Sequence, residues 1–112
     1  MVKLPYSSFR QVGNIYFIAG QIGFKDGALV SEDFKEQTIQ AVANLTEILK
    51  QNEMTIENVV DVTVFITEQV DLPAFNEVYA KEFKEPFPAR AAVTVKALPF
   101  GAKVELKSVA VK

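Results

Sequence analysis

The segment 60–67 alternates apolar and polar side chains without a break, and this pattern constrains the fold more than any other part of the chain. Successive side chains of a strand point to opposite faces, so the segment is predicted to be a strand with one buried face. The residues predicted to share that buried face are Val60, Val62, Val64 and Ile66. The other face carries Asp61, Thr63, Phe65 and Thr67. A strand of this kind needs a second layer to cover its apolar side.

Two amphipathic helices are predicted to supply that layer. Ser31 is the expected N-cap of the first helix, which ends at residues 51–52. Its apolar stripe, at spacings of three and four, consists of Phe34, Thr38, Ala41, Val42, Leu45, Ile48 and Leu49. Asp71 is the expected N-cap of the second helix, and Pro86 and Pro88 follow its end. The stripe of this second helix consists of Leu72, Phe75, Val78, Tyr79 and Phe83.

Turn residues separate the remaining strand segments. Gly13-Asn14 between two apolar runs indicates a hairpin, and Asp26-Gly27 marks a second turn. The predicted strands occupy residues 7–12, 15–22, 28–30, 60–67, 91–97 and 103–111. The order of elements predicts a single α+β domain over residues 1–112, with both helices on one face of a mixed sheet. If the last two strands form a hairpin around Pro99-Phe100, Arg90 pairs near residue 109, roughly 10–15 Å from Glu105.

One face of that sheet has no helix to cover it. This face would carry Phe65, Tyr16 or Phe17, and the Ala and Val residues of the closing strands. An exposed apolar face on a chain of 112 residues indicates self-association.

Composition excludes several classes of chemistry. The chain contains no Cys and no His, which removes disulfides, thiolate metal sites and Ser-His-Asp triads, and no metal site is predicted. The formal net charge of −2, without a run of like charges, does not favour nucleic acid as a partner. No apolar run of 18 residues and no apolar leader segment are present, so no membrane association is predicted and a cytoplasmic location is expected.

Three residues stand out as candidates for a site, each with a structural alternative. Arg90 is one of two Arg against ten Lys; its guanidinium fork suits a carboxylate, and the alternative is a structural ion pair. Glu105 could orient water, or it could belong to a solvated stripe with Lys103 and Lys107. Gly20 interrupts an apolar strand, where it allows close approach of a ligand or marks a bulge.

An ordered set of short motifs then makes the chain recognisable. The motifs are Pro5-Tyr6-Ser7, Ile18-Ala19-Gly20-Gln21-Ile22, Gln37-Thr38, Asn44-Leu45, Asn58-Val59-Val60, Thr63-Val64-Phe65, Phe75-Asn76-Glu77-Val78-Tyr79, Phe87-Pro88-Ala89-Arg90 and Val104-Glu105-Leu106. Taken together over the whole chain, they closely resemble the RidA/YjgF family of enamine/imine deaminases, of which some members are called L-PSP endoribonucleases. The resemblance implies a chorismate-mutase-like fold and a homotrimer with ligand sites in clefts between subunits.

The resemblance also assigns roles to residues. It implies that Arg90 anchors the substrate carboxylate, that Glu105 and Tyr6 are catalytic, and that Tyr6 and Gly20 line the substrate cleft. On the residues alone, half-buried strand packing is the favoured interpretation of Tyr6, while Asn76 and Tyr79 are interpreted as structural. The implied substrates are 2-enamino and 2-imino acids such as 2-aminoacrylate, which would yield 2-keto acids and ammonia without a cofactor.

Two positions depart from the family pattern. Many deaminating members carry Ser where this chain has Ala19, and Cys where it has Ala92. Loss of the Ser hydroxyl removes one hydrogen bond near the reacting carbon, worth about 1 kcal/mol. Two alternatives therefore stay open: a trimer that binds carboxylate metabolites without catalysis, and a ribonuclease or translation inhibitor. The second has little support, because the chain lacks a His pair and a basic patch.

Overall fold

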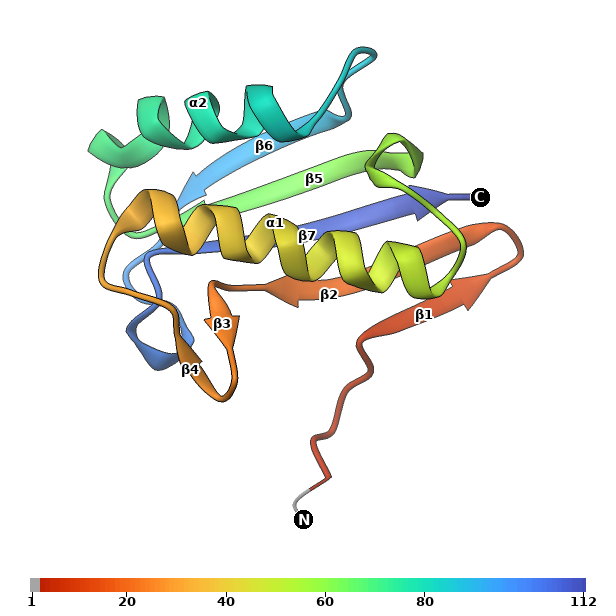
Figure 1. Ribbon diagram of the computed structural model, residues 1–112, viewed down its shortest axis with the longest axis horizontal. Coiled ribbons are helices and arrows are strands. Elements are labelled where there is room, and N and C mark those ends of the chain that lie inside the picture. The colour runs from red at the N-terminus through yellow and green to blue at the C-terminus, as the bar shows by residue number, and fades with distance from the viewer. Residues whose placement is uncertain (1–2) are drawn as a thin grey trace.

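A five-stranded mixed sheet carries both helices of the chain on one of its faces (Figure 1). The computed structural model describes residues 3–112. Its strands, in their order across the sheet, are β1 (Phe9–Val12), β2 (Ile15–Gln21), β7 (Val104–Val111), β5 (Val59–Ile66) and β6 (Ala89–Thr94). The helices are α1 (Phe34–Gln51) and α2 (Leu72–Glu82). The predicted α+β class and the placement of both helices on one face are confirmed.

Short elements connect this framework. Strands β3 (Phe24–Lys25) and β4 (Ala28–Leu29) form a small separate hairpin around the predicted Asp26-Gly27 turn. Three 3-10 helices, η1 (Ile56–Asn58), η2 (Gln69–Asp71) and η3 (Pro99–Gly101), precede β5, α2 and β7 respectively. The Gly13-Asn14 turn joins β1 and β2, as predicted.

A closing hairpin between the last two strands does not form. Strand β6 pairs in parallel with β5, and β7 lies between β2 and β5. The segment β5–α2–β6 is a strand–helix–strand unit, and such a crossover returns the chain parallel to the strand it left. The connection through η3 then places β7 on the other side of β5 from β6. Arg90 is consequently opposite Val62 of β5, and not opposite residue 109.

The buried face of β5 differs from the prediction at its first residue. Val59 is buried, whereas Val60 is 46% exposed. The pairing register between β5 and β7 shifts between Val59 and Asp61, which is the signature of a bulge. One extra residue in the strand turns Val60 outward, and the alternation holds only from Val62 onward.

Helix α1 begins two residues later than predicted. Asp33 is its N-cap, and the Oδ2 of Asp33 accepts a hydrogen bond of 2.9 Å from the N–H of Glu36. Ser31 instead accepts a 2.8 Å hydrogen bond from the N–H of Asp33. Ser31 and Asp33 both have side chains suited to capping, so the sequence spacing alone does not show which of them is the N-cap. Asp71 occupies the predicted N-cap of α2, without a side-chain hydrogen bond.

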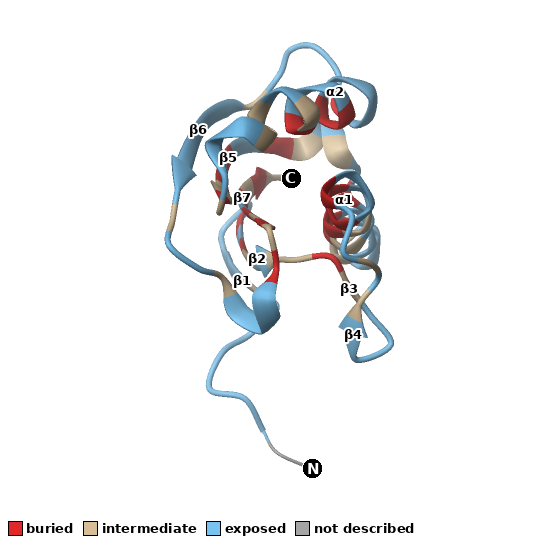
Figure 2. Ribbon diagram, turned by 90° about the vertical axis from the view of Figure 1, so that its left-hand side faces the viewer, coloured by how far each residue is buried: buried red, intermediate tan, exposed pale blue. Residues whose placement is uncertain are grey.

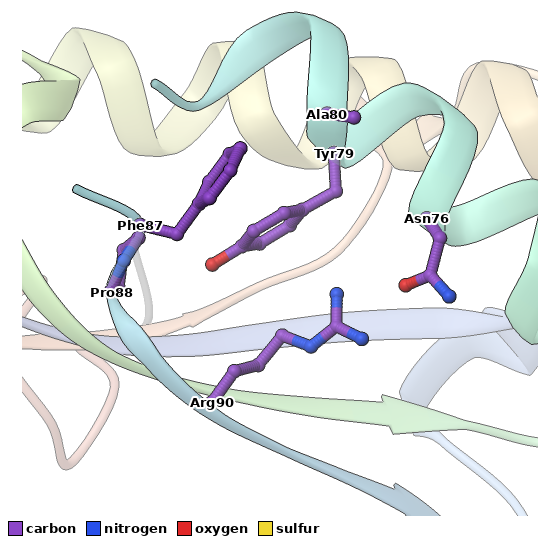
Figure 3. A pocket seen from close by; sticks show the side chains of 6 residues that line it. All are labelled: Asn76, Tyr79, Ala80, Phe87, Pro88 and Arg90. Atoms are coloured by element: carbon purple, nitrogen blue, oxygen red, sulfur yellow. The ribbon is translucent and has the colours of Figure 1, made fainter. Parts of the chain in front are cut away.

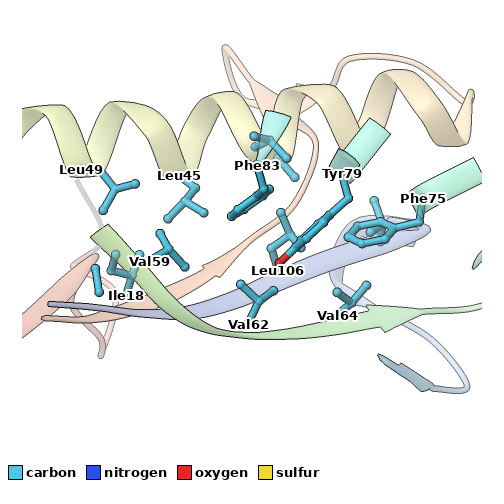
Figure 4. Close-up of a cluster of buried hydrophobic side chains, with 14 of the residues drawn as sticks. Ile18, Leu45, Leu49, Val59, Val62, Val64, Phe75, Tyr79, Phe83 and Leu106 are labelled. Atoms are coloured by element: carbon cyan, nitrogen blue, oxygen red, sulfur yellow. The ribbon is translucent and has the colours of Figure 1, made fainter. Parts of the chain in front are cut away.

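The core fills the space between the helices and the sheet (Figures 2 and 4). The predicted stripes of α1 and α2 provide most of its helical side, except that Ile48 and Leu72 are only partly buried. Gln37, which the periodicity did not select, is also buried. Its amide donates to the carbonyl of Ser31, and its Oε1 accepts from the N–H of Lys103, so it connects α1 to the start of β7.

The opposite face of the sheet stays open in the single chain, as predicted. Tyr16 lies in the core, Phe65 is half-buried, and Phe17 is exposed. The exposed apolar residues of this face and its edges include Val12, Ile15, Phe17 and Val93. No helix among residues 3–112 combines the length and apolar character needed to cross a bilayer.

Gly23 brings the chain after β2 against the backbone of α1. A Cβ at this position would lie 2.6 Å from the Cα of Gln37, which cannot move aside as a side chain could. We expect Gly23→Ala to lower the free energy of unfolding by about 3 kcal/mol, measured by denaturant titration. Gly13→Ala is the control, because a Cβ there meets nothing within 4 Å and only the positive φ of 61° is penalised. Equal losses in the two variants would contradict this packing argument.

Candidate functional site

A pocket beside the edge strand β6 contains Arg90 (Figure 3). This pocket, called the Arg90 pocket below, has a volume of about 280 Å³. Its lining residues are Asn76, Tyr79, Ala80, Phe87, Pro88 and Arg90. Helix α2 supplies one wall, and the segment leading from Phe87 into β6 supplies the other (Figure 3).

The side chain of Arg90 lies on the helix-covered face of the sheet. Its partner across the β5–β6 ladder is Val62, a core residue, and Figure 3 shows the guanidinium directed toward α2. The guanidinium carbon lies 4.9 Å from the ring centroid of Tyr79 and 5.5 Å from that of Phe75. Within residues 3–112 it forms no ion pair, so the structural ion pair considered above is not formed by the described residues. Aromatic rings hold the charge in place, and its donors can take an external anion.

Tyr79 adds a polar group to the Arg90 pocket. The residue is 5% exposed, and its hydroxyl has no hydrogen-bond partner in the described chain. Burial raises the pKa of Tyr79 above its ordinary value of 10.0, and the charge of Arg90 opposes this shift. The hydroxyl is therefore a neutral donor at neutral pH. Figure 3 shows the ring of Tyr79 beside the guanidinium, with its hydroxyl directed toward Phe87 and Pro88.

A second pocket surrounds Glu105, where β2 ends. This pocket, called the Glu105 pocket below, has a volume of about 300 Å³. Its lining residues are Leu4, Tyr6, Gly20, Gln21, Ile22, Phe24, Asn44, Pro99, Phe100 and Glu105. Three of the four residues to which the sequence assigned roles, namely Tyr6, Gly20 and Glu105, therefore line one pocket.

Gly20 and Glu105 are in direct proximity. A Cβ on Gly20 would lie 2.6 Å from the Oε2 of Glu105, so the glycine leaves room for the carboxylate. The register between β2 and β7 also shifts between Ile18 and Gln21, which agrees with the structural alternative of a bulge in this part of the strand. Burial raises the pKa of Glu105 above its ordinary value of 4.5.

The solvated Lys-Glu-Lys stripe, which was the structural alternative for Glu105, is not held by ion pairs among residues 3–112. The Nζ of Lys107 donates to the carbonyl of Ile18 at 2.9 Å, and the Nζ of Lys103 donates to the carbonyl of Glu32. Within residues 3–112, Glu105 has no ion-pair partner. Each ammonium group is occupied by a backbone carbonyl, which leaves the carboxylate in a partly dehydrated pocket without a counter-charge.

Tyr6 is also placed differently from its structural alternative. It precedes β1, belongs to no strand and is 68% exposed, so it does not take part in half-buried strand packing. Its position on the wall of the Glu105 pocket leaves its hydroxyl accessible to a ligand.

Arg90 and Glu105 lie on opposite faces of the sheet. Arg90 pairs with the buried Val62, whereas Glu105 pairs with Phe65 on the open face. Val104 and Leu106, which flank Glu105, point into the core. A single chain therefore does not bring Arg90 together with Glu105, Gly20 and Tyr6.

Several lining residues were missed or interpreted as structural from the sequence. Asn76 and Tyr79 have the i, i+3 spacing of neighbours on one helix face. That face becomes part of a pocket only because the segment from Phe87 to Arg90 packs beside it. Asn44 has a clearer structural task, because its amide donates to the carbonyls of Ile22 and Phe24 at 3.0 and 2.9 Å. No group of three carboxylates suited to a metal ion occurs in residues 3–112.

Comparison with known proteins gives consistent similarities over the full length. The sequence model described as endoribonuclease L-PSP matches residues 2–112. The human protein named 2-iminobutanoate/2-iminopropanoate deaminase is 42% identical over 110 residues, which cover 96% of this chain and 80% of the human protein. RidA from the Antarctic bacterium Psychrobacter sp. PAMC 21119 superposes with a TM-score of 0.93 at 36% identity, covering 100% of this chain and 92% of that one. E. coli TdcF, solved with bound serine, gives a TM-score of 0.90 at 27% identity, with coverages of 99% and 91%.

Proposed function

Because the chain belongs to the endoribonuclease L-PSP family, which includes RidA proteins, we propose that it hydrolyses 2-imino acids to 2-keto acids and ammonia. The human relative's name supplies the reaction class. The residue chemistry agrees with it: an available guanidinium suits the carboxylate of such a substrate, and a partly buried carboxylate suits activation of water. The substrates are 2-iminopropanoate, the tautomer of 2-aminoacrylate, and its homologues.

The site is proposed to form between subunits of a homotrimer with a chorismate-mutase-like arrangement. The observation that carries this proposal is the location of Arg90 and Glu105 in different pockets on opposite faces of one chain. The open apolar face of the sheet provides a surface for the association, and β6, which carries Arg90, is an edge strand. Arg90 of one copy would then complete the Glu105 pocket of its neighbour.

In the proposed reaction, Arg90 binds the substrate carboxylate through its two parallel donors. Ionised Glu105 removes a proton from water while the water oxygen bonds to the imine carbon, and the C=N electron pair moves to nitrogen. Glu105 then returns that proton to nitrogen, which makes the amine a leaving group. As the C–N bond breaks, Glu105 accepts the proton of the new hydroxyl and passes it to the released ammonia, so the products are the 2-keto acid and ammonium. The Tyr6 hydroxyl and the Gly20 backbone hold the water and substrate in place. An iminium ion is already electrophilic, so positioning and electrostatics are sufficient.

The direct test uses imines made in the assay by an amino-acid oxidase acting on short amino acids. Release of the 2-keto acid is followed with semicarbazide present, which traps imine that has not been hydrolysed. The proposal expects the protein to reduce semicarbazone formation in proportion to its concentration. Equal trapping with and without the protein would contradict it.

The pH dependence of the reaction follows from the environment of Glu105. Burial raises its pKa, and the mechanism needs the ionised form, so kcat is expected to fall with decreasing pH from a higher pH than an ordinary glutamate would give. Stability has the opposite sign. Folding favours the protonated form of Glu105. The contribution of Glu105 to folding stability is therefore fully present below its unfolded-state pKa and is lost as pH rises through its folded-state pKa. A pH profile of kcat that has no acidic limb would rule out this role for Glu105.

A non-catalytic role as a carboxylate-binding trimer is the second candidate. It is favoured by Ala19, which lacks the hydroxyl that many deaminating members carry, and by the Arg90 pocket, whose lining includes a guanidinium but no carboxylate. This candidate predicts saturable binding of 2-keto acids with no acceleration of imine hydrolysis. A nuclease function, which the family description names, has no support in a chain of net charge −2 without His.

A further inference from the structure

Phe100 combines high exposure with an unusual backbone conformation. Its φ of 60° and ψ of 18° lie in the left-handed region, and its side chain is 74% exposed. Bulky residues rarely adopt this conformation, because Cβ approaches the following carbonyl oxygen. The core receives little from a ring that is mostly in solvent. A strained, exposed aromatic residue at the wall of a pocket indicates a role in binding.

The ring of Phe100 is paired with that of Phe24. Their centroids are 4.6 Å apart, and the planes are inclined by 45°. Both residues line the Glu105 pocket. The backbone of Phe24 is held in position by two contacts. Gly23 packs against the backbone of α1, and the Asn44 amide donates a hydrogen bond to the Phe24 carbonyl.

The backbone around Phe100 is also fixed. The N–H of Ala102, a buried residue, donates to the carbonyl of Pro99 at 3.0 Å. The next N–H, that of Lys103, donates to the Oε1 of Gln37 at 2.9 Å, and Gln37 is itself buried in α1. The two rings are therefore presented by rigid supports, and a ligand would gain their surface without having to order a loop.

The Glu105 pocket has an apolar part in addition to its carboxylate. The apolar lining residues are Leu4, Ile22, Phe24, Pro99 and Phe100. A one-carbon side chain, as in 2-iminopropanoate, cannot cover this surface. We propose that Phe100, paired with Phe24, forms a subsite for the substrate side chain and favours 2-imino acids with branched aliphatic or aromatic side chains. This inference rests on the proposed function, which it extends to a substrate class.

The test measures binding and selectivity after Phe100→Asn. Asparagine accepts the left-handed conformation, so the variant keeps the loop while losing the ring. Affinities for phenylpyruvate and 4-methyl-2-oxopentanoate are compared with that for pyruvate by calorimetry. The proposal expects about a tenfold loss for the two large keto acids and less than about a twofold change for pyruvate. The melting temperature is expected to stay the same or rise.

Glu53→Asn is the matched control. Glu53 also has a positive φ, of 59°, but it lines neither the Arg90 pocket nor the Glu105 pocket. It should leave the ratio of the affinities for the large keto acids and for pyruvate unchanged, although it also removes the 3.3 Å ion pair between Glu53 and Lys112. An equal loss of affinity for all three keto acids in Phe100→Asn, or no loss of affinity, would overturn the subsite. Dissociation of the Phe100→Asn assembly on size exclusion would also overturn it.

The binding and kinetic readouts separate this inference from the function on which it rests. Imines made from leucine, phenylalanine and alanine are tested with the same two variants. A wild-type protein that binds large keto acids through Phe100 but accelerates no imine hydrolysis would contradict the proposed function and leave the subsite standing. Acceleration of every imine with an affinity ratio insensitive to Phe100→Asn would contradict the subsite alone.

Discussion

Replacing Arg90 by alanine is expected to lower kcat/KM for 2-imino acids by about a hundredfold or more, because charge-assisted hydrogen bonds to a carboxylate contribute about 1.5–3 kcal/mol each. Binding of 2-keto acids should weaken in parallel. Arg90→Lys keeps the charge but loses the two-pronged geometry, so an intermediate loss is expected. The measurements are keto-acid release from enzymatically generated imines and calorimetric binding of pyruvate.

Stability must be followed in the same variants. Arg90 lies over the rings of Tyr79 and Phe75, and loss of these contacts is expected to cost about 1 kcal/mol. Lys81→Ala removes an exposed cation of α2 outside the Arg90 pocket and serves as the control. Wild-type rates in Arg90→Ala would disprove the anchor.

The proposed location of the site between subunits is tested with mixed subunits. Chains carrying Arg90→Ala and chains carrying Glu105→Gln are unfolded together and refolded as a mixture. If one copy supplies Arg90 and its neighbour supplies Glu105, random assembly restores about a quarter of the intact sites. If one chain supplied both groups, every site would be defective and no activity would return.

Replacing Glu105 by glutamine is expected to lower kcat by about a hundredfold to ten-thousandfold, the range found for loss of a general base. Keto-acid affinity should change little, because the proposed mechanism assigns the binding of the carboxylate to Arg90 and not to Glu105. Burial disfavours the charged form of Glu105, so the neutral amide should not destabilise the fold. Single-turnover kinetics and thermal unfolding provide the two measurements.

Gly20→Ala tests the same group without changing it chemically. The added Cβ would meet the Oε2 of Glu105, the mobile end of a side chain, so the carboxylate should move and the chain should stay folded. We expect low kcat with near-normal stability, in contrast to Gly23→Ala. Glu47→Gln, on the exposed face of α1, controls for loss of a negative charge. Full activity in Glu105→Gln would remove that residue from the mechanism.

The local elements could be predicted because their signals are local. Three- and four-residue spacing located both helices, and the turns at Gly13-Asn14 and Asp26-Gly27 located two hairpins. The bulge at Val60 escaped prediction, since a one-residue insertion leaves the alternating pattern visible while changing the face of its first member. The pairing of β6 escaped for another reason: partner choice depends on the β5–α2–β6 crossover and not on the sequence of β6.

The candidate site depended on resemblance more than on pattern. Arg90, Glu105, Gly20 and Tyr6 follow from the family motifs, and their distribution over two pockets appears only when the strands are placed in space. Tyr79 has the periodicity of a core residue, and it is one; the contact of its ring with the Arg90 guanidinium and its unpaired hydroxyl are tertiary features. Phe100 gives no periodic signal, because its conformation arises from the turn that leads into β7.

The placement of Arg90 and Glu105 on opposite faces has a consequence for how activity would depend on protein concentration. Under the proposed mechanism, a solitary chain folds fully yet remains inert, since neither half-site can act without the other. Specific activity would then collapse on dilution below the dissociation threshold, while circular dichroism of the chain stayed unchanged. Newly synthesised chains would therefore be inactive and would gain activity only when they assemble.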